Sequence, residues 1–233
     1  AELAGRCTGR FFGWVAGSGE PIGAIGDFLA AARNRNTPSW RSAPAAVTIE
    51  RTVIGWLSEA VGCDGFAGSL CGGGSMANLM ALAIAREKML PANDDGARPG
   101  VVYASEQVHM SIPKAMALLG LGRSNLRLIP IDEDFRLRSD ALEAAISRDR
   151  KSGKKPLAIV ASVGTVATGA IDPLREIAKI AETEGLWLHV DGAFGVLAAL
   201  AAPDRFDGLN LAASISLDAH KWLSQPIDCG CLL

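Results

Sequence analysis

Apolar residues recur along this chain with two periods, one typical of amphipathic helices and the other of buried strands. Short apolar runs predict strands at 101–103, 126–130, 157–163 and 186–191 and in the first half of 214–223. Helical spacing of apolar residues predicts helices at 42–61, 75–89, 112–119 and 139–150 and between 172 and 185. Since helices and strands alternate, the pattern predicts an α/β fold with a mainly parallel sheet.

Residues that favour helix ends mark several boundaries of these segments. Ser139 is expected to cap the helix that it opens, Asp172 to cap the next helix, and Gly185 to close that second helix. Residues 11–26 are rich in glycine and aromatic side chains, so we expect irregular structure there, followed by a short helix at 27–35.

Length, charge and composition place the chain among globular proteins of one domain. It has 233 residues, of which 49% are hydrophobic, and this is enough apolar material for a sizeable core. A formal net charge of −2 argues against a nucleic-acid surface or a polybasic membrane contact. No apolar run reaches the roughly 18 residues of a membrane-spanning helix. We therefore expect neither a nucleic-acid partner nor a membrane partner.

The five cysteines are scattered and never spaced as a CxxC pair, which predicts free thiols in a reduced, cytoplasmic protein. Cys229 and Cys231 could hold a metal, but they lack a second pair, so buried strand positions are the favoured interpretation. The chain lacks an initiator Met, and residues 229–233 form an apolar run without a polar tail. We therefore expect a fragment of a longer protein, whose last strand is cut and leaves a sheet edge exposed.

The first candidate site residues are the basic pair His220-Lys221. This pair follows an apolar, strand-like run and precedes Trp222. An amine at the end of a buried strand must be solvated, paired or covalently used. Desolvation leaves a lysine neutral and nucleophilic, which is what a Schiff base with an aldehyde cofactor requires. A surface lysine at a strand end is the alternative.

The segment Gly72-Gly73-Gly74-Ser75 directly precedes a predicted helix. Glycines let the backbone approach a ligand closely, and free N–H groups at a helix N-terminus bind phosphate. With Ala77, the segment also matches the loose dinucleotide-binding pattern GxGxxA. That pattern would need a clear strand at 66–70 and a later acidic residue, for which only Glu106 is available. A purely structural glycine turn is a third interpretation.

Two further candidates, His109 and Asp191, follow predicted strands. His109 comes after a strand and a short loop, where a histidine by itself is more often structural. Asp191 ends an apolar strand, where an isolated carboxylate is costly, and a protonated pyridine nitrogen would be its natural partner. His189 could share a strand face with Asp191 and bind a metal, but with three histidines in all and no HExxH motif we expect no metal.

Taken in order, four motifs resemble those of the group II pyridoxal-phosphate-dependent amino acid decarboxylases, which include the aromatic amino acid, glutamate and diaminobutyrate decarboxylases. The motifs lie at 72–79, 109–114, 189–195 and 218–222, and the resemblance extends from about Phe11 to the last residue. It implies the type I pyridoxal-phosphate fold, similar to the large domain of aspartate aminotransferase. It also implies a homodimer in which residues 1–41 pack on the partner subunit, while residues 42–233 form an incomplete cofactor-binding large domain.

The resemblance implies a role for each matching residue. Lys221 would hold pyridoxal 5'-phosphate as a Schiff base, His109 would stack on the pyridine ring, and Asp191 would keep the ring nitrogen protonated, so these three are the implied catalytic residues. Gly74 and Ser75 would bind the phosphate. The implied cofactor contacts are Gly74, Ser75, His109, Thr165, Asp191, Ala193, His220 and Lys221.

The chain departs from the family pattern at several of these motifs. The departures are Thr8 and Gly9 for a His-Pro pair, Met76 for Glu, Val166 for Thr, Phe194 for Tyr and Ala219 for Pro. Val166 and Phe194 each remove a hydroxyl close to the expected cofactor.

The implied reaction is the decarboxylation of an L-amino acid to its amine and carbon dioxide. One alternative is another pyridoxal-phosphate-dependent lyase or a transaminase, and a second is an oxidoreductase that binds nicotinamide at 72–77. A third is a catalytically incomplete fragment that only associates with other chains.

Overall fold

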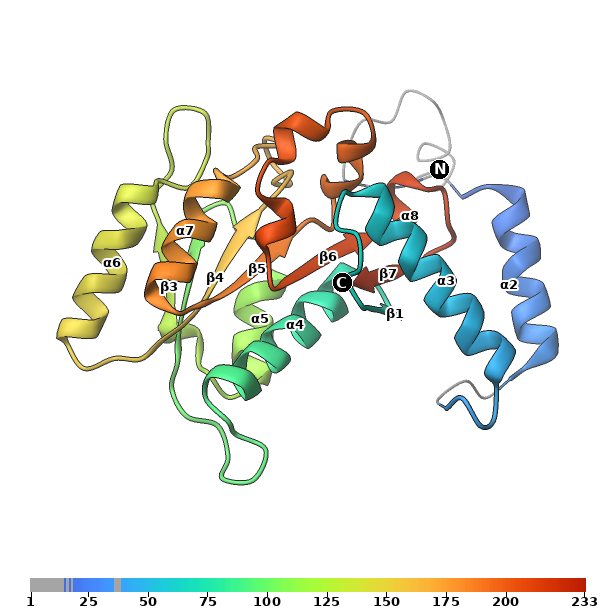
Figure 1. Ribbon diagram of the computed structural model, residues 1–233, viewed down its shortest axis with the longest axis horizontal. Coiled ribbons are helices and arrows are strands. Elements are labelled where there is room, and N and C mark those ends of the chain that lie inside the picture. Colours follow the sequence, from blue (N-terminus) through green and yellow to red (C-terminus); the bar gives the residue numbers. More distant parts are fainter. Residues whose placement is uncertain (1–14, 16, 18, 36–38) are drawn as a thin grey trace, which may run out of the picture.

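The computed structural model of the chain describes residues 15, 17, 19–35 and 39–233 and contains one seven-stranded sheet (Figure 1). Thr8, Gly9 and the first residues of the segment at 11–26 lie outside the described part. The strands are β1 (Ser69–Cys71), β2 (Val101–Ser105), β3 (Leu126–Ile129), β4 (Pro156–Ser162), β5 (Trp187–Asp191), β6 (Ser214–Asp218) and β7 (Gly230–Leu232). Their order across the sheet is β1-β7-β6-β5-β4-β2-β3.

Neighbouring strands from β3 to β6 pair in parallel, and only β7 runs against its two neighbours, β6 and β1. The prediction of a mainly parallel sheet is confirmed. Parallel strands lie in the middle of a fold and are covered on both faces, which is why their sequences read as continuous apolar runs. Every residue of β2 is buried, and so is every residue of β4 after Pro156.

Helices cover both faces of the sheet (Figure 1). The α-helices are α2 (Pro21–Arg33), α3 (Pro44–Ala60), α4 (Gly74–Met89), α5 (Ser111–Leu118), α6 (Ser139–Lys151), α7 (Leu174–Glu184) and α8 (Ala219–Trp222). Short 3-10 turns lie at Arg123–Asn125, Val196–Leu200, Pro203–Phe206 and Leu209–Leu211. Within the described residues, no helix combines the length and the apolar character needed to cross a membrane.

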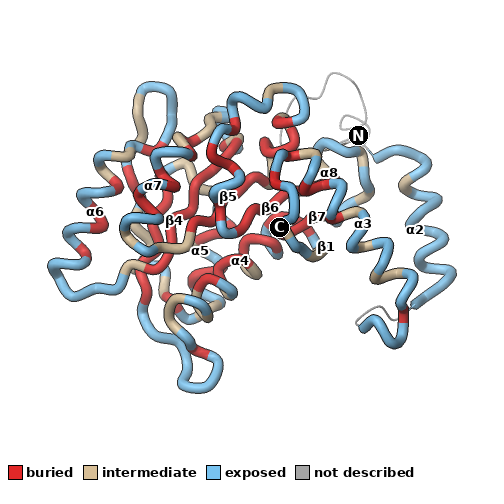
Figure 2. The backbone as a smooth tube through the Cα atoms, viewed as in Figure 1, coloured by how far each residue is buried: buried red, intermediate tan, exposed pale blue. Residues whose placement is uncertain are grey.

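Two large apolar clusters form most of the core, one on each face of the sheet. Side chains of α3, α6 and α7 pack in the larger cluster, whereas α4 and α5 pack in the other, around Leu82, Ile112 and Met116. Figure 2 shows that buried residues concentrate in the strands and along α4, while α2 has no buried residue. The sheet and α4 therefore form a rigid base on which the loops after the strands are held.

The N-terminal helix starts earlier than the sequence predicts. We expected irregular structure up to residue 26 and a helix at 27–35, but α2 begins at Pro21 and ends at Arg33. Proline is well suited to the first turn of a helix because its fixed φ matches the helical value and its missing N–H has no acceptor there. Gly23 and Gly26 lie within this helix, although each costs about 1 kcal/mol relative to alanine.

Two of the predicted helix caps are wrong. Ser139 is the first residue of α6 instead of its cap, and its hydroxyl donates to Glu176 Oε2 at 2.7 Å. Asp172 does not cap α7, because its carboxylate accepts the backbone N–H groups of Leu137 and Ser162, each at 2.7 Å. Gly185 does close α7 in the left-handed conformation, as expected.

The apolar C-terminal run does not leave a sheet edge exposed, contrary to expectation. β7 lies between β6 and β1, and both of its edges are paired. Its neighbour β1, only three residues long, forms the edge and runs antiparallel to β7. A dinucleotide-binding unit would instead need a strand before the glycine segment that belongs to a parallel βαβ unit. The structure therefore argues against that interpretation of 72–77.

Candidate active site

All eight residues predicted to contact a cofactor line a single cavity of about 360 Å³. They are Gly74, Ser75, His109, Thr165, Asp191, Ala193, His220 and Lys221. The structure thus brings together residues that are separated by up to about two thirds of the chain. Their individual roles stay predictions.

The cavity lies where four parallel strands end, which is where α/β sheets bind their ligands. The strands β2, β4, β5 and β6 each end in a polar residue, namely Ser105, Ser162, Asp191 and Asp218. Parallel strands bring their carboxyl ends to the same edge of the sheet, so the loops that follow them meet there. Three of these four strand ends, all but Ser105, line the cavity directly.

The glycine segment brings the N-terminus of α4 to the cavity wall. Gly73 precedes the helix with φ of 90°, a value that favours glycine. A Cβ atom on Gly74 would lie 2.6 Å from Cβ of Ala193 and 2.8 Å from Oδ2 of Asp218, so only glycine fits. The first N–H groups of a helix have no acceptor within the helix, and here they border a cavity. This is a suitable position for an anion such as a phosphate.

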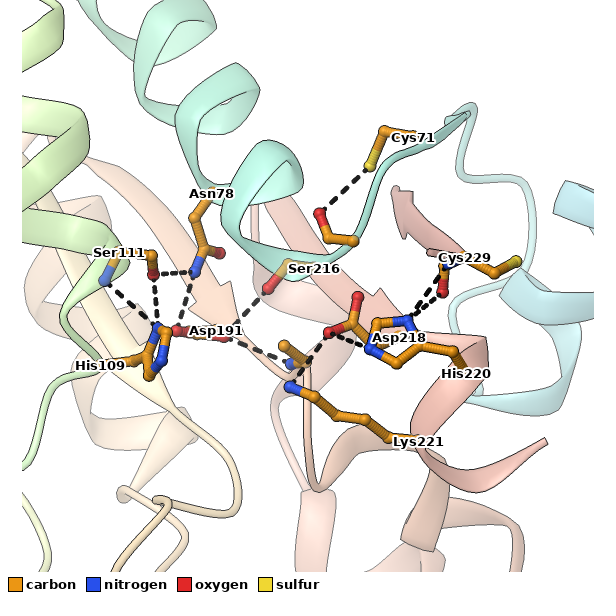
Figure 3. A network of polar contacts seen from close by, with 12 residues as sticks. Cys71, Asn78, His109, Ser111, Asp191, Ser216, Asp218, His220, Lys221 and Cys229 are labelled. Carbon is orange, nitrogen blue, oxygen red and sulfur yellow. Dashed lines mark hydrogen bonds and ion pairs between the residues drawn. The ribbon is translucent and has the colours of Figure 1, made fainter. Parts of the chain in front are cut away.

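Asp191 accepts hydrogen bonds on both of its carboxylate oxygens (Figure 3). Asn78 Nδ2 donates to Oδ2 at 2.9 Å, while Ser216 Oγ donates to Oδ1 at 3.1 Å and the Ala193 N–H to Oδ1 at 3.3 Å. These three donors hold the carboxylate in one orientation. Asp191 is 8% exposed, so its charge faces the cavity instead of bulk water.

His109 is held by a neighbouring serine on the opposite side of the cavity. Its Nδ1 lies 2.8 Å from Ser111 Oγ and also accepts the Ser111 N–H at 3.2 Å. The same hydroxyl receives a hydrogen bond from Asn78 Nδ2 at 2.9 Å. Asn78 therefore links His109, through Ser111, to Asp191 (Figure 3).

Lys221 lies one turn beyond the end of β6, in the short helix α8. Its amine is 3.0 Å from Oδ2 of Asp218, the last residue of β6. The Asp218 side chain is 3% exposed, and its other oxygen, Oδ1, has no hydrogen-bond partner among the described residues. His220 Nε2 lies 3.7 Å from the same carboxylate, while its Nδ1 contacts the backbone of Cys229. The amine is thus inside the cavity and paired with a buried carboxylate.

The remaining predicted contacts shape the cavity wall. The Thr165 hydroxyl lies 2.7 Å from the Thr168 hydroxyl and accepts the Ala170 N–H at 3.2 Å, so it is engaged within its own loop. Val166, which replaces a threonine, also lines the cavity. Phe194 packs its ring 5.9 Å from that of Trp222, so its aromatic body fixes the residue next to Lys221 even without a hydroxyl.

His189 is buried beneath the cavity and does not line it. Burial lowers the pKa of His189 from the ordinary value of 6.5 to about 4, so the imidazole is neutral at physiological pH. The metal interpretation of His189 and Asp191 finds no support, because the described residues contain no group of three or more side chains suited to a metal. Asn78 lies between the two instead and contacts both.

Sequence reasoning missed four polar residues of this site: Asn78, Ser111, Ser216 and Asp218. Signals for three of them were present. Asn78 follows Gly74 by four residues and so shares its helix face, Ser111 is two residues from His109, and Asp218 opens the motif that contains Lys221. Ser216 becomes a candidate only when β6 is paired with β5, which places it opposite Asp191.

Comparison with known proteins adds independent support. The model of the pyridoxal-dependent decarboxylase conserved domain matches residues 8–233. The aromatic-L-amino-acid decarboxylase of Bacillus atrophaeus is 39% identical over 96% of this chain and 47% of its own length. The phenylacetaldehyde synthase of Petunia hybrida is 36% identical over 96% of this chain and 46% of its own length. The crystal structure of mouse CSAD matches with a TM-score of 0.90 at 32% identity, covering 96% of this chain and 48% of that one.

The parallel sheet, with its cavity at the strand ends, and the structural match define a protein with the type I pyridoxal-phosphate fold. The chain belongs to the pyridoxal-dependent decarboxylase family. Both the predicted fold class and the predicted family are confirmed. The chain spans about half the length of the curated relatives it matches.

Proposed function

We propose that the protein to which this chain belongs decarboxylates an L-amino acid with pyridoxal 5'-phosphate. The observation that carries the proposal is the convergence of Lys221, Asp191, His109 and the N-terminus of α4 on one cavity. Each of these groups matches a different part of the cofactor: the aldehyde, the ring nitrogen, the ring face and the phosphate.

The residues present fit this cofactor. Gly74 leaves room beside Ala193 and Asp218 that a Cβ atom would fill, and the helix N-terminus behind it favours an anion. The buried oxygen Oδ1 of Asp218 has no hydrogen-bond partner within the described part of the chain, so it is available to accept a hydrogen bond from a ligand in the cavity. Across the cavity, Asp191 presents a carboxylate whose three hydrogen-bond donors hold it in place.

When bound, pyridoxal phosphate supplies an aldehyde and an electron-withdrawing ring. Lys221 would hold the aldehyde through its amine, for which it would leave the ion pair with Asp218. Asp191 would hold a proton at the ring nitrogen, which favours withdrawal of electrons from the substrate carbon. The substrate amine would take the place of Lys221 at the aldehyde, and the freed Lys221 amine would then be available to return a proton to the substrate carbon after carbon dioxide leaves.

Replacement of Lys221 tests the proposal directly. In the full-length protein, Lys221→Ala should abolish the cofactor adduct that borohydride fixes to wild-type protein, and turnover should fall by several orders of magnitude. Noncovalent cofactor binding should remain in part, because Gly74, Ser75, His109 and Asp191 are unchanged. Peptide mapping of the reduced protein identifies the modified lysine.

Lys114 is the matched control, since it is exposed, lies close to His109 in sequence and has an amine that lies 3.6 Å from Met110 Sδ. Lys114→Ala should keep both the adduct and the activity. Adduct formation on Lys114, or on any lysine other than Lys221, would refute the catalytic assignment.

The reaction products distinguish decarboxylation from other reactions on the same cofactor. An amine and carbon dioxide in equal amounts support the proposal, whereas an aldehyde or a keto acid indicates a different reaction on the same cofactor. The assay therefore measures carbon dioxide, amine, aldehyde and keto acid from aromatic, acidic and basic L-amino acids.

We further propose that the N-terminal segment, residues 1–41, packs on the partner subunit of a homodimer. α2 buries none of its residues within this chain, yet it exposes Ile22, Ile25, Phe28 and Leu29, by 54% to 73% each. A row of exposed apolar side chains on a helix marks an interaction surface. A second copy of the chain fits the homodimer that the family resemblance implies.

Phe28→Glu should shift the full-length protein from dimer to monomer in sedimentation analysis, because it places a charge in the proposed contact. Leu118→Glu is the control, since Leu118 is a comparably exposed apolar residue, on α5. A Phe28→Glu protein that remains as dimeric as the Leu118→Glu protein would contradict this assignment of α2.

A cytoplasmic location is also part of the proposal. The described cysteines Cys63, Cys71, Cys229 and Cys231 are all free. Free thiols suit a reducing compartment.

A further inference from the structure

Beneath the proposed cofactor site, Asn78 and His189 form a buried polar layer that the decarboxylation chemistry does not itself use. Asn78 is 1% exposed and His189 is fully buried. His189 Nε2 lies 2.9 Å from Asn78 Oδ1, and Asn78 Nδ2 lies 2.9 Å from both Asp191 Oδ2 and Ser111 Oγ. The Asn78 amide therefore contacts Asp191, Ser111 and the buried imidazole of His189.

The chemistry of these groups permits only one orientation of the Asn78 amide. An ionised carboxylate accepts hydrogen bonds and donates none, so the NH₂ group of Asn78 must face Asp191. Flipping the amide would place two acceptors 2.9 Å apart. With its NH₂ group committed, Asn78 presents its oxygen to His189, and this contact requires a hydrogen on Nε2 of the imidazole.

Burial lowers the pKa of His189 to about 4, so the ring carries one hydrogen, and Nδ1 must then accept. Two groups of Ser214 face Nδ1: the hydroxyl, 2.9 Å away, which can donate to it, and the backbone carbonyl, 3.2 Å away, which only accepts. Because the Asn78 oxygen requires the single ring hydrogen on Nε2, the hydroxyl is the hydrogen-bond partner of Nδ1. Ser214 Oγ in turn accepts the indole N–H of Trp187 at 2.9 Å. The direction of every hydrogen bond from Trp187 to Asp191 is thereby fixed.

The second hydrogen of the Asn78 amide begins a branch of the same hydrogen-bond chain, and this branch leads to His109. It donates to Ser111 Oγ, so the Ser111 hydroxyl is free to donate to His109 Nδ1. The Ser111 N–H donates to the same nitrogen. Since the N–H can only donate, Nδ1 must accept, and a His109 ring with one hydrogen carries it on Nε2.

We infer that Asn78 and His189 are positioning residues in a one-directional hydrogen-bond relay, which runs from Trp187 to Asp191 and His109. The relay holds the Asp191 carboxylate in place and selects the Nε2–H tautomer of His109. This inference rests on the proposed function, because Asp191 and His109 are the groups expected to hold the pyridine ring.

Histidine tautomers test the relay without any reaction. In full-length protein labelled with ¹⁵N-histidine, long-range proton–nitrogen NMR spectra should show the Nε2–H tautomer for both His189 and His109 at neutral pH. The His189→Gln variant identifies the His189 signals. An Nδ1–H tautomer at His189 would overturn the relay, whatever the enzyme's activity.

Cofactor affinity provides the second measurement. His189→Leu removes the donor to Asn78, so pyridoxal phosphate should bind about tenfold or more weakly, the size expected for loss of a hydrogen bond in a network that ends on a charge. His189→Gln, whose amide N–H can donate to Asn78, should recover most of that affinity. Equal affinity for wild type and His189→Leu would refute the inference, and failure of glutamine to do better than leucine would also count against it.

The Asn78→Asp variant provides a measurement that would not change if Asn78 had only a structural role. It sets a second carboxyl group against Asp191, and two such groups share one proton, so the pH dependence of the bound cofactor's absorbance should shift. Asn125→Asp is the control, because Asn125 donates to the Leu121 carbonyl and does not line the cavity. An unshifted profile in Asn78→Asp would contradict the relay.

These results separate the inference from the proposed function. If wild-type protein binds the cofactor with the predicted tautomers but releases no carbon dioxide, the proposed reaction fails and the relay stands. If it decarboxylates an amino acid while His189 carries its hydrogen on Nδ1, the relay fails and the reaction stands.

Discussion

Gly74→Ala tests whether the glycine segment is fitted to the site or only connects β1 to α4. In the structure, the added Cβ atom would lie 2.6 Å from Cβ of Ala193 and 2.8 Å from Oδ2 of Asp218. Neither neighbour is the far end of a long, flexible side chain. Gly74 does not need a left-handed φ, so the expected effect comes from the close contacts alone.

The magnitude follows from the overlap. Unbonded carbon atoms approach to about 3.5–4.0 Å, so the contact with Ala193 is too short by roughly 1 Å. Overpacking of this kind costs about 1–3 kcal/mol. The loop must shift, and with it Asp218, which holds the Lys221 amine at 3.0 Å. Converted at 1.4 kcal/mol per tenfold change, the part of this cost that arises only in the cofactor-bound state should lower cofactor affinity, by up to about 150-fold, and the rest should lower the stability of the cofactor-free protein.

Gly72→Ala is the matched control, because Gly72 belongs to the same segment and an added Cβ atom would meet nothing within 4 Å. Urea denaturation of the cofactor-free proteins should show a loss of stability for Gly74→Ala that Gly72→Ala does not share. Titration with pyridoxal phosphate then measures the loss of affinity. A Gly74→Ala protein as stable and as tightly binding as wild type would refute the argument from close packing.

Two further predictions concern the charges of the site. Asp191→Asn should keep the cofactor but lower decarboxylation by about 10²-fold or more, because the amide keeps the shape and removes the charge facing the ring nitrogen; unchanged turnover in the full-length protein would disprove this role. His189 should make the folded chain less stable as the pH falls from 6.5 towards 4, because the unfolded chain binds a proton that the buried ring, with a pKa of about 4, does not. The loss is on the order of 3 kcal/mol, and urea denaturation from pH 4 to 7 should show a flatter profile for His189→Gln than for wild type. Burial raises the pKa of Asp172 to about 6, so this residue affects the pH dependence of stability in the opposite direction. Asp172 is present in both proteins, so the difference between their profiles isolates His189. Equal slopes would show that His189 is protonated in the folded protein.

The sequence by itself determined most of the helices and strands of the fold and the candidate positions of the site. Both are local properties. A buried strand such as 157–163 is apolar at every residue except Ser162, and β6 ends where its polar residue Asp218 begins the lysine motif. All parallel strands end at one edge of the sheet, and in the structure this brings Lys221, Asp191 and His109, which the sequence grouped only through the family resemblance, to one cavity.

Local patterns misjudged the segments whose conformation depends on distant partners. Ser139 and Asp172 have the residue types of helix caps, but Glu176 and the backbone of Leu137 and Ser162 offered them other partners. The apolar run at 229–233 was expected at an exposed edge. It lies inside the sheet because β1, which is distant in sequence, covers it.

Only the tertiary structure decided how the site residues contact one another. Asn78 and His189 are 111 residues apart in sequence, and nothing in their local patterns indicates a contact at 2.9 Å. Asp218 becomes the partner of Lys221 because α8 turns the chain back over the end of β6. Hydrogen bonds of this kind depend on the packing of α4 against the sheet, which brings distant parts of the chain within reach, whereas apolar periodicity records only which face of each element is buried.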